Sequence, residues 1–96
     1  MNFGEHFEWD EAKAVSNLAK HGVSFIEAVA AFADPCRVIL PDLDHGRGER
    51  RWYCLGQVGD AILTVRFTRR DRRVRVIGAG YWRKGKRLYE TQNPIR

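Results

Sequence analysis

The hydrophobic pattern at the start of the chain predicts a short strand and a helix. Residues 7–9 (Phe-Glu-Trp) are typical of a strand, and Asp10 is a suitable N-cap for a helix over residues 11–21. That helix carries three apolar residues on one stripe, Ala14, Val15 and Leu18. Gly22 is expected to end it, because glycine adopts the left-handed backbone conformation at little cost.

A second helix is predicted directly afterwards. Ser24 and Glu27 form a capping box, in which the hydroxyl bonds forward and the carboxylate reaches back. Its apolar face is supplied by Phe25, Ala28, Val29 and Phe32. The helix should stop at Asp34-Pro35, because a residue that precedes proline avoids the helical conformation.

From residue 36 onward the pattern is typical of strands. Strands are predicted over residues 36–40, 51–58, 62–68 and 73–79, with a polar loop over 41–49 and turns at Gly59-Asp60 and Arg70-Asp71-Arg72. The third of these strands alternates clearly, with Leu63, Val65 and Phe67 on one face and Thr64, Arg66 and Thr68 on the other. Residues 83–91 should form a basic helix anchored by Leu88 and Tyr89.

These elements predict one α+β domain over residues 1–96, in the order β-α-α-β-β-β-β-α. Strands joined by short turns favour an antiparallel sheet of about four to five strands, with the helices covering one face. No apolar run approaches the roughly 20 residues that a membrane helix requires. The acidic start lacks the basic region and apolar stretch of a signal peptide, so we expect a cytoplasmic protein with no membrane contact.

Neither cysteine predicts a metal site. Cys36 and Cys54 lie within apolar runs and have no second Cys or His at ligand spacing, which favours two buried free thiols. The loop over residues 42–45 (Asp-Leu-Asp-His) has oxygen ligands at i and i+2, but only Glu49 follows as a further carboxylate. A polar hairpin loop explains this segment better, and we expect neither a metal nor a cofactor.

The charge is distributed unevenly along the chain. The first 48 residues contain 4 Lys/Arg against 8 Asp/Glu, a net charge of −4, and the rest contain 13 against 4, a net charge of +9. Of the 17 basic residues 13 are arginine, whose planar guanidinium suits the recognition of phosphate. The second half therefore favours a polyanionic ligand, and the first half favours a basic partner.

Five groups of residues, in order along the chain, resemble the BrnT family of toxins. They are Phe7-Glu8-Trp9-Asp10-Glu11-x-Lys13, Asn17-x-x-Lys20-His21-Gly22-Val23-Ser24-Phe25, Glu49-x-Arg51-Trp52 leading to Gly56, Thr68-x-Arg70 with Arg75-Val76-Ile77, and Arg83 to Tyr89-Glu90. The second group is the most specific. Together they cover nearly the whole chain.

The resemblance implies a RelE-like fold and a ribonuclease toxin of a type II toxin–antitoxin system that inhibits translation. It also implies a BrnA-type antitoxin with a ribbon-helix-helix DNA-binding domain, so that promoter DNA is bound only through the toxin–antitoxin complex. The chain departs from many relatives at two places. Its last strand ends in Gly78-Ala79-Gly80 where they have Ser-Ala-Arg, and Phe67 stands where they often have a polar residue.

RNA can be cleaved without a metal, because its own 2′-hydroxyl attacks the adjacent phosphorus. The protein then has to move two protons and stabilise a charged phosphorane. Arg51, Arg66 and Arg75 are candidates for the last task, because they project from strands that are predicted to be neighbours. The alternative for each is an ordinary solvated strand residue.

Lys20 and His21, at the end of the first helix, are candidates for proton transfer. Histidine side chains titrate near neutrality, although a basic pair at a helix C-terminus also offsets the helix dipole. Tyr89 is a further catalytic candidate and Tyr81 its alternative, either as a proton donor or as a residue that stacks on a base. Both tyrosines are also typical of the edge of a core.

Five more basic residues are candidates for RNA binding, namely Arg70, Arg73, Arg83, Lys84 and Arg87. The last helix could instead present a solvated face or bind the antitoxin.

Three functions remain open at this point. The chain is an endoribonuclease, a catalytically silent homologue that binds the antitoxin and acts as a co-repressor, or a toxin of the same fold that acts on a protein such as DNA gyrase. The missing arginine after the last strand favours the second. A homodimer is a further possibility that the sequence leaves open.

Overall fold

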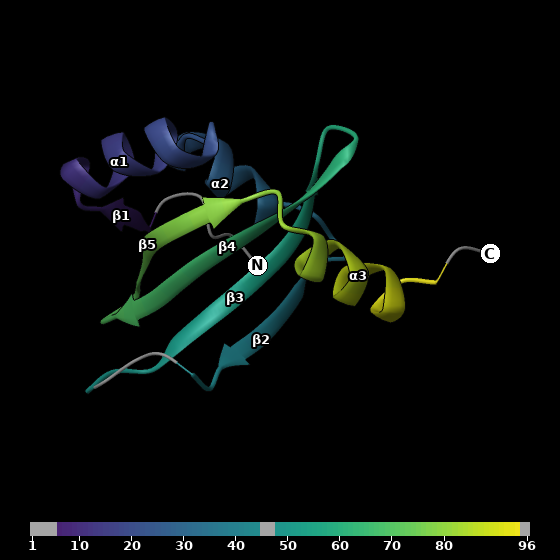
Figure 1. The fold of residues 1–96 in the computed structure, drawn as a ribbon. Helices are drawn as coiled ribbons and strands as arrows, with labels where there is room; N and C mark the ends of the chain where they lie inside the picture. Colours follow the sequence, from purple (N-terminus) through teal and green to yellow (C-terminus); the bar gives the residue numbers. More distant parts are fainter. Residues whose placement is uncertain (1–5, 45–47, 95–96) are drawn as a thin grey trace.

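The computed structural model describes residues 6–44 and 48–94 of the chain, which form a sheet with helices on both of its faces (Figure 1). The elements in chain order are β1 (Phe7–Trp9), α1 (Glu11–His21), α2 (Phe25–Ala31), β2 (Val38–Asp42), β3 (Arg51–Val58), β4 (Ala61–Arg70), β5 (Arg73–Gly80) and α3 (Arg83–Gln92). The predicted α+β class is confirmed. Within the described ranges no helix is long and apolar enough to cross a membrane.

The sheet is mixed, so the prediction of an antiparallel sheet is wrong for one strand. The spatial order is β1-β5-β4-β3-β2, in which β2 to β5 are antiparallel neighbours and β1 pairs parallel to β5. Phe7 lies opposite Val74 in this pairing. The parallel direction arises because the chain leaves β1 into α1 and returns to β5 only after a long crossover, whereas short turns connect β3, β4 and β5.

One face of the sheet, here called the core face, packs against α2. The alternation predicted for β4 is confirmed, because Leu63, Val65 and Phe67 are at most 4% exposed on this face. Phe25 and Phe32 complete the same cluster from the helical side. Phe67 packs edge-on against Phe32 at 5.1 Å between ring centroids.

The opposite face, here called the groove face, carries α3, so the prediction that all helices cover one face is wrong. Gly85 of α3 lies directly over Thr64 and Leu55, and a Cβ atom at Gly85 would overlap Thr64. Figure 1 shows α3 beside β3 and β4 and apart from α1 and α2. A helix without a side chain at its contact point can approach a strand closely, which explains the glycine within this basic helix.

The α1 helix covers the end of β5 that β1 leaves unpaired. Its Asn17 donates from Nδ2 to the carbonyl of Ala79 (2.9 Å) and accepts from the backbone N–H of Ala79 at Oδ1 (3.1 Å). The same amide donates to the carbonyl of Val23 (3.0 Å). One side chain therefore satisfies backbone groups that a further strand would otherwise pair.

The helix caps are largely as predicted. Asp10 accepts from the N–H of Ala12 (2.8 Å), Gly22 has φ +68°, and the Ser24 hydroxyl accepts from the N–H of Glu27 (2.9 Å). The second half of the capping box is wrong, because the Glu27 carboxylate accepts a hydrogen bond from the Tyr81 hydroxyl instead.

Several boundaries and burials differ from the predictions. The second helix ends at Ala31, and the next strand begins at Val38 rather than at residue 36. The predicted apolar stripe of α1 is largely exposed, because Val15 and Leu18 are 63% and 52% exposed. The helix packs instead through the side that carries Asn17, its buried residue. Both cysteines are free; Cys54 is buried as predicted, but Cys36 is exposed, because it precedes the strand. His45, in the loop considered for a metal, lies outside the described residues.

Candidate active site

Arg51, Arg66 and Arg75 project from the groove face, and alternation along the strands predicts this for Arg66 and Arg75. The strand register places Arg75 opposite Thr68 and Thr68 opposite Arg51, so these residues form one row across β5, β4 and β3. Arg66 lies two residues from Thr68 along β4 and pairs with Gly78 and Tyr53 on either side. Neighbouring strands are about 4.8 Å apart, so the three arginines lie within roughly 10 Å of one another at their backbones.

Two of these arginines contain unsatisfied polar atoms. The Nε atoms of Arg51 and Arg66 are buried and have no hydrogen-bond partner in the part of the chain that the structure describes. A buried donor without an acceptor costs free energy, and guanidinium groups are strong donors to phosphate oxygens. Each of these side chains therefore keeps a buried donor that no group of the described residues satisfies.

A pocket of about 210 Å³, here called the α1 pocket, opens between α1 and the groove face. Its lining includes the candidates Lys20, His21 and Arg66, and also Lys13. Lys13 and Lys20 are seven residues apart on α1 and so lie on the same side of the helix, facing Arg66 on β4. Among the described residues, its lining contains these three cations and no carboxylate, so the pocket favours an anion.

Trp82 forms one wall of the α1 pocket and contacts His21. The two rings meet edge to face, with 5.3 Å between centroids and an interplanar angle of 87°. The indole sits over Gly80, where an added Cβ atom would overlap it. Gly80 is therefore required for the packing of Trp82, whereas a Cβ at Gly78 would make only an ordinary contact of 3.6 Å with Asn17.

A larger hollow of about 510 Å³, here called the α3 pocket, adjoins the α1 pocket. Arg66 and Trp82 line both of them. The lining of the α3 pocket includes the apolar residues Leu40, Pro41, Leu43, Leu55 and Leu88, and also the carboxylates of Asp42 and Asp44. Arg66 and Trp82 therefore lie where the two pockets adjoin, and the two pockets together are here called the groove.

Three predicted arginines are engaged in ion pairs at the edge of the sheet. Arg73 and Arg75 both bind Glu8 of β1, with N–O distances of 3.3 and 3.1 Å, and Arg70 binds Glu49 at 3.5 Å. The hydrogen bond from Arg75 is the main cause of the lowered pKa of Glu8. Arg75 shares the groove face with Arg66 but does not line the α1 pocket.

The structure does not bring Tyr89 to the α1 pocket. Its hydroxyl donates to Asp34 Oδ2 (2.6 Å), which also accepts from the N–H of Gln57 (2.7 Å). Burial, followed by the hydrogen bond to Asp34, raises the pKa of Tyr89 to about 12. Tyr89 therefore joins α3 to the loop after α2 and to β3, and it is placed for structure rather than for proton transfer at His21.

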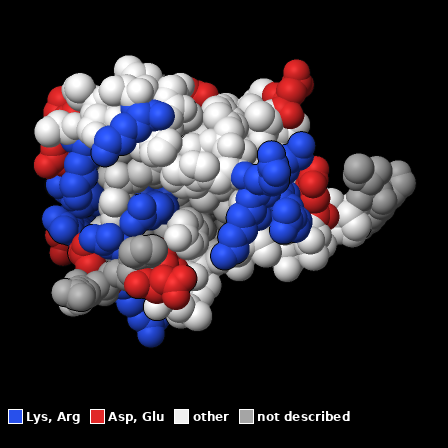
Figure 2. Space-filling model, in the orientation of Figure 1, with Lys and Arg blue, Asp and Glu red and all other residues white. Residues whose placement is uncertain are grey.

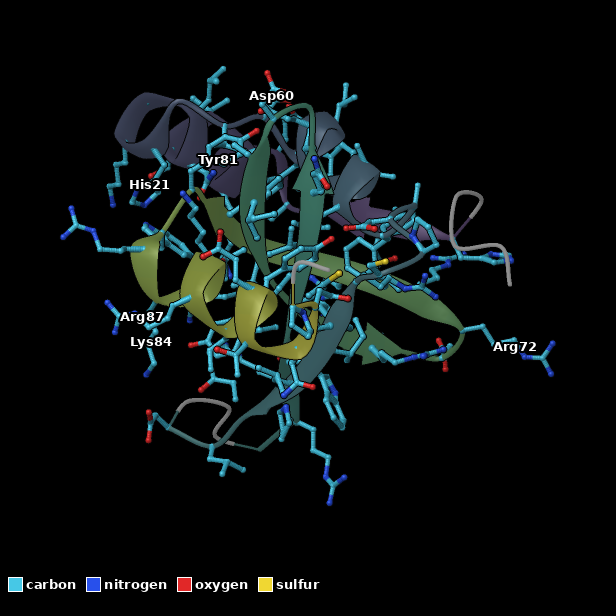
Figure 3. The ribbon with its side chains drawn as sticks, turned by 90° about the vertical axis from the view of Figure 1, so that its right-hand side faces the viewer. His21, Asp60, Arg72, Tyr81, Lys84 and Arg87 are labelled. Carbon is cyan, nitrogen blue, oxygen red and sulfur yellow. The ribbon has the colours of Figure 1, made fainter. Side chains whose placement is uncertain are left out.

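The remaining candidates lie on α3. Lys84 lines the α3 pocket, and Arg83 lines a third hollow of about 310 Å³, here called the hairpin pocket, beside the turn at Asp60. Figure 2 shows basic side chains gathered over α3, and more of them where α1 and β5 lie. In Figure 3, His21, Lys84 and Arg87 lie toward one side of the molecule and Arg72 toward the other.

Lys13 and Trp82, which the geometry adds to the candidate site, were not among the predicted site residues. Lys13 could have been found from its spacing of seven residues from Lys20. Trp82 had no such signal, because it follows the last strand and its partners His21 and Gly80 come from different elements. Among the described residues no group of three or more His, Cys, Asp and Glu side chains is placed to hold a metal ion.

The departures from the family pattern fall on different faces. Phe67 is buried on the core face, so it changes the packing and not the groove. Gly78 lines the α1 pocket, and Gly80 lies in contact with the indole of Trp82.

Comparison with known proteins supports one family. No curated protein matches the chain. The family model described as "Ribonuclease toxin, BrnT, of type II toxin-antitoxin system" matches residues 9–85, well over half of the chain and all of the α1 pocket. This chain therefore belongs to the BrnT family of ribonuclease toxins of type II toxin–antitoxin systems.

Proposed function

We propose that this chain is an endoribonuclease that cleaves RNA in the α1 pocket without a metal ion, and that it thereby inhibits translation in the cytoplasm. We also propose that it acts as a single RelE-like domain. The observation that carries the proposal is the meeting of Lys13 and Lys20 from α1 with Arg66 from β4 around His21. A site with this composition suits one phosphate group and a group that exchanges protons.

The proposed reaction is an intramolecular transesterification, in which the phosphorus of the RNA backbone exchanges its bond to the 5′-oxygen for a bond to the 2′-oxygen. The 2′-hydroxyl loses its proton to a base and attacks the phosphorus, and the 5′-oxygen of the next nucleotide leaves with a proton. The products are a 2′,3′-cyclic phosphate and a free 5′-hydroxyl. We assign one of the proton transfers to His21, and the stabilisation of the phosphorane to Arg66 and Lys20.

The rest of the groove would bind the flanking phosphates. Lys84 lines the α3 pocket, and Arg51 lies on the same groove face, two residues along β3 from Tyr53, which also lines that pocket. Each phosphate that such residues neutralise on a single strand should contribute about −0.7 to the slope of log affinity against log salt. We assign Arg83 and Arg87 to weaker contacts, because they are exposed on α3.

We further propose that the antitoxin of this family member is of the BrnA type, with a ribbon-helix-helix domain through which the complex binds promoter DNA. Family membership supports an antitoxin partner. Co-expression with the neighbouring gene product, followed by co-purification, tests its identity.

The first experiment measures cleavage of a single-stranded RNA by the purified chain in the presence of EDTA. We expect cleavage to persist and to leave 2′,3′-cyclic phosphate ends. His21→Ala should slow it by about 10²- to 10⁴-fold, the usual range for loss of a general acid or base. Arg66→Gln should slow it by about 10²- to 10³-fold, as when one donor to the transition state is removed.

Arg72→Gln is the matched control for Arg66→Gln, because it removes the same charge from the turn on the far side of the molecule (Figure 3). If Arg72→Gln and Arg66→Gln lowered the cleavage rate equally, the assignment of Arg66 to the active site would be contradicted. Induced expression in cells, with and without the antitoxin, separates the alternatives. Growth arrest with intact RNA would favour a protein target, and normal growth with folded protein would favour a silent co-repressor.

A further inference from the structure

We propose that Trp82 is the stacking platform for one base of the bound RNA, and that this base occupies the α3 pocket while its phosphate lies in the α1 pocket. The inference rests on the proposed RNA-cleaving function and assigns a nucleobase subsite to it.

The position of Trp82 carries the argument. Its indole lines the α1, α3 and hairpin pockets, and it shares the first two with Arg66. A nucleotide whose phosphate contacts Arg66 therefore has its base next to the indole. Trp9 and Trp52 pack against the core, so Trp82 is the tryptophan that the fold leaves for a ligand.

The indole is held in place before any ligand arrives. Gly80 lies beneath it and His21 meets it edge to face. Tyr81 is tied to α2 through Glu27, and the carbonyl of Trp82 accepts from the N–H of Lys86 (3.1 Å) at the start of α3. A preorganised aromatic surface loses little conformational entropy when a base stacks on it.

The α3 pocket has the chemistry that a base requires. Apolar side chains such as Leu40, Leu55 and Leu88 suit the faces of a base, and Lys84 lies at the same pocket to meet a phosphate. The carboxylates of Asp42 and Asp44, which also line the pocket, disfavour a phosphate beside them but can accept hydrogen bonds from the N–H groups of a base. A volume of about 510 Å³ lies within the usual range for small-molecule sites. Because every base has an aromatic face, stacking predicts little base preference at this position.

The test compares two uncleavable probes of equal length and charge. One is a fluorescein-labelled 2′-O-methyl RNA octamer, and the other is an octamer of the same backbone without bases. Trp82→Ala should weaken binding of the RNA octamer by about 5- to 150-fold, the range found when a stacking residue is removed, and binding of the base-free octamer by less than about 2-fold. Trp82→Phe should retain most of the affinity.

Gly80→Ala provides a second, independent variant. An added methyl group at this position must displace the indole, so it should weaken binding of the RNA octamer in the wild-type background and have no further effect in the Trp82→Ala background. Arg72→Gln, in the turn on the far side of the molecule (Figure 3), is the control and should leave binding of both octamers almost unchanged. The slope of affinity against salt should not change in Trp82→Ala, whereas Arg66→Gln should reduce it by about 0.7.

An equal loss for both octamers in a folded Trp82→Ala variant would overturn the stacking proposal. If that variant also cleaves RNA at the wild-type rate, the ribonuclease proposal survives. Failure of the wild-type chain to bind either octamer and to cleave RNA would overturn both.

Discussion

The two faces of the sheet differ although the same strands build both. On the core face, Val65 and Val76 are at most 1% exposed, and three edge-to-face aromatic contacts tie β1, α2 and β4 together. On the groove face, the same strands present Arg66 and Arg75, pockets open to the surface, and the Nε of Arg66 has no partner among the described residues.

The difference shows how one alternating pattern separates stability from chemistry. Every second residue of β4 packs the core, and the residues between them are free to carry charge. A substitution on the core face should therefore change the stability and leave RNA cleavage almost unchanged. A substitution on the groove face should do the reverse. The predictions below are ordered from the largest expected effect to the smallest.

The largest effect is expected on the core face. Phe25 is 2% exposed and stacks edge-on against Trp9, so Phe25→Ala should lower the free energy of unfolding by about 3–5 kcal/mol. Urea denaturation measures this change. The RNA cleavage rate per folded molecule should stay close to wild type, and a loss comparable to that of Arg66→Gln would show that the two faces are coupled.

A smaller loss of stability is expected at Asp34, which joins the two helical layers at one end of the sheet. Burial alone raises the pKa of its carboxyl, but hydrogen bonds from Tyr89, Gln57 and Cys36 outweigh this and lower it overall. Asp34→Asn should cost about 2 kcal/mol at neutral pH, because the amide has only one acceptor oxygen. Thermal or urea unfolding measures the loss.

The pH dependence of that loss has a definite sign. Because the pKa of Asp34 is lower in the folded state, its contribution is complete above the unfolded value of about 4 and is lost as the pH falls through the folded value. The stability gap between the wild type and Asp34→Asn should therefore narrow below about pH 4. A gap that stays constant down to pH 2 would contradict the role of the carboxylate.

The smallest effect is expected at the edge of the groove face. Glu8 holds Arg73 and Arg75 in ion pairs and keeps them from other anions. Glu8→Gln should therefore tighten binding of a single-stranded RNA by about 1.5- to 5-fold, the range of exposed ion pairs, and steepen its salt dependence. Glu90→Gln, on α3, removes the same charge elsewhere and should have less effect. Binding that changes no more in Glu8→Gln than in Glu90→Gln would place these arginines outside the RNA path.

Much of the fold could be predicted from local signals. Alternation located β3 to β5, and the residues at Asp10, Gly22 and Ser24 fixed the ends of two helices. The parallel pairing of β1 was not predictable. No short turn connects β1 to β5, and its three residues alone do not indicate whether the two strands run parallel or antiparallel. The face of the sheet that α3 covers could not be predicted either, because it depends on Gly85 and on packing across the sheet.

The candidate site could be predicted only where one element carries it. Alternation placed Arg66 on the right face of β4, and the end of α1 supplied Lys20 and His21. The hydrogen bonds of Tyr89 and the position of Trp82 depend on residues from several distant segments, so no spacing along the chain reveals them.

The parallel pairing of β1 with β5 also has a consequence for the synthesis of this protein. The α1 pocket is lined by residues of α1, β4, β5 and by Trp82, which follows β5, and β5 lies between β1 and β4 in the sheet. Domains emerge from the ribosome N-terminal end first. The site proposed for RNA cleavage can therefore form only after the ribosome has synthesised the chain through Trp82.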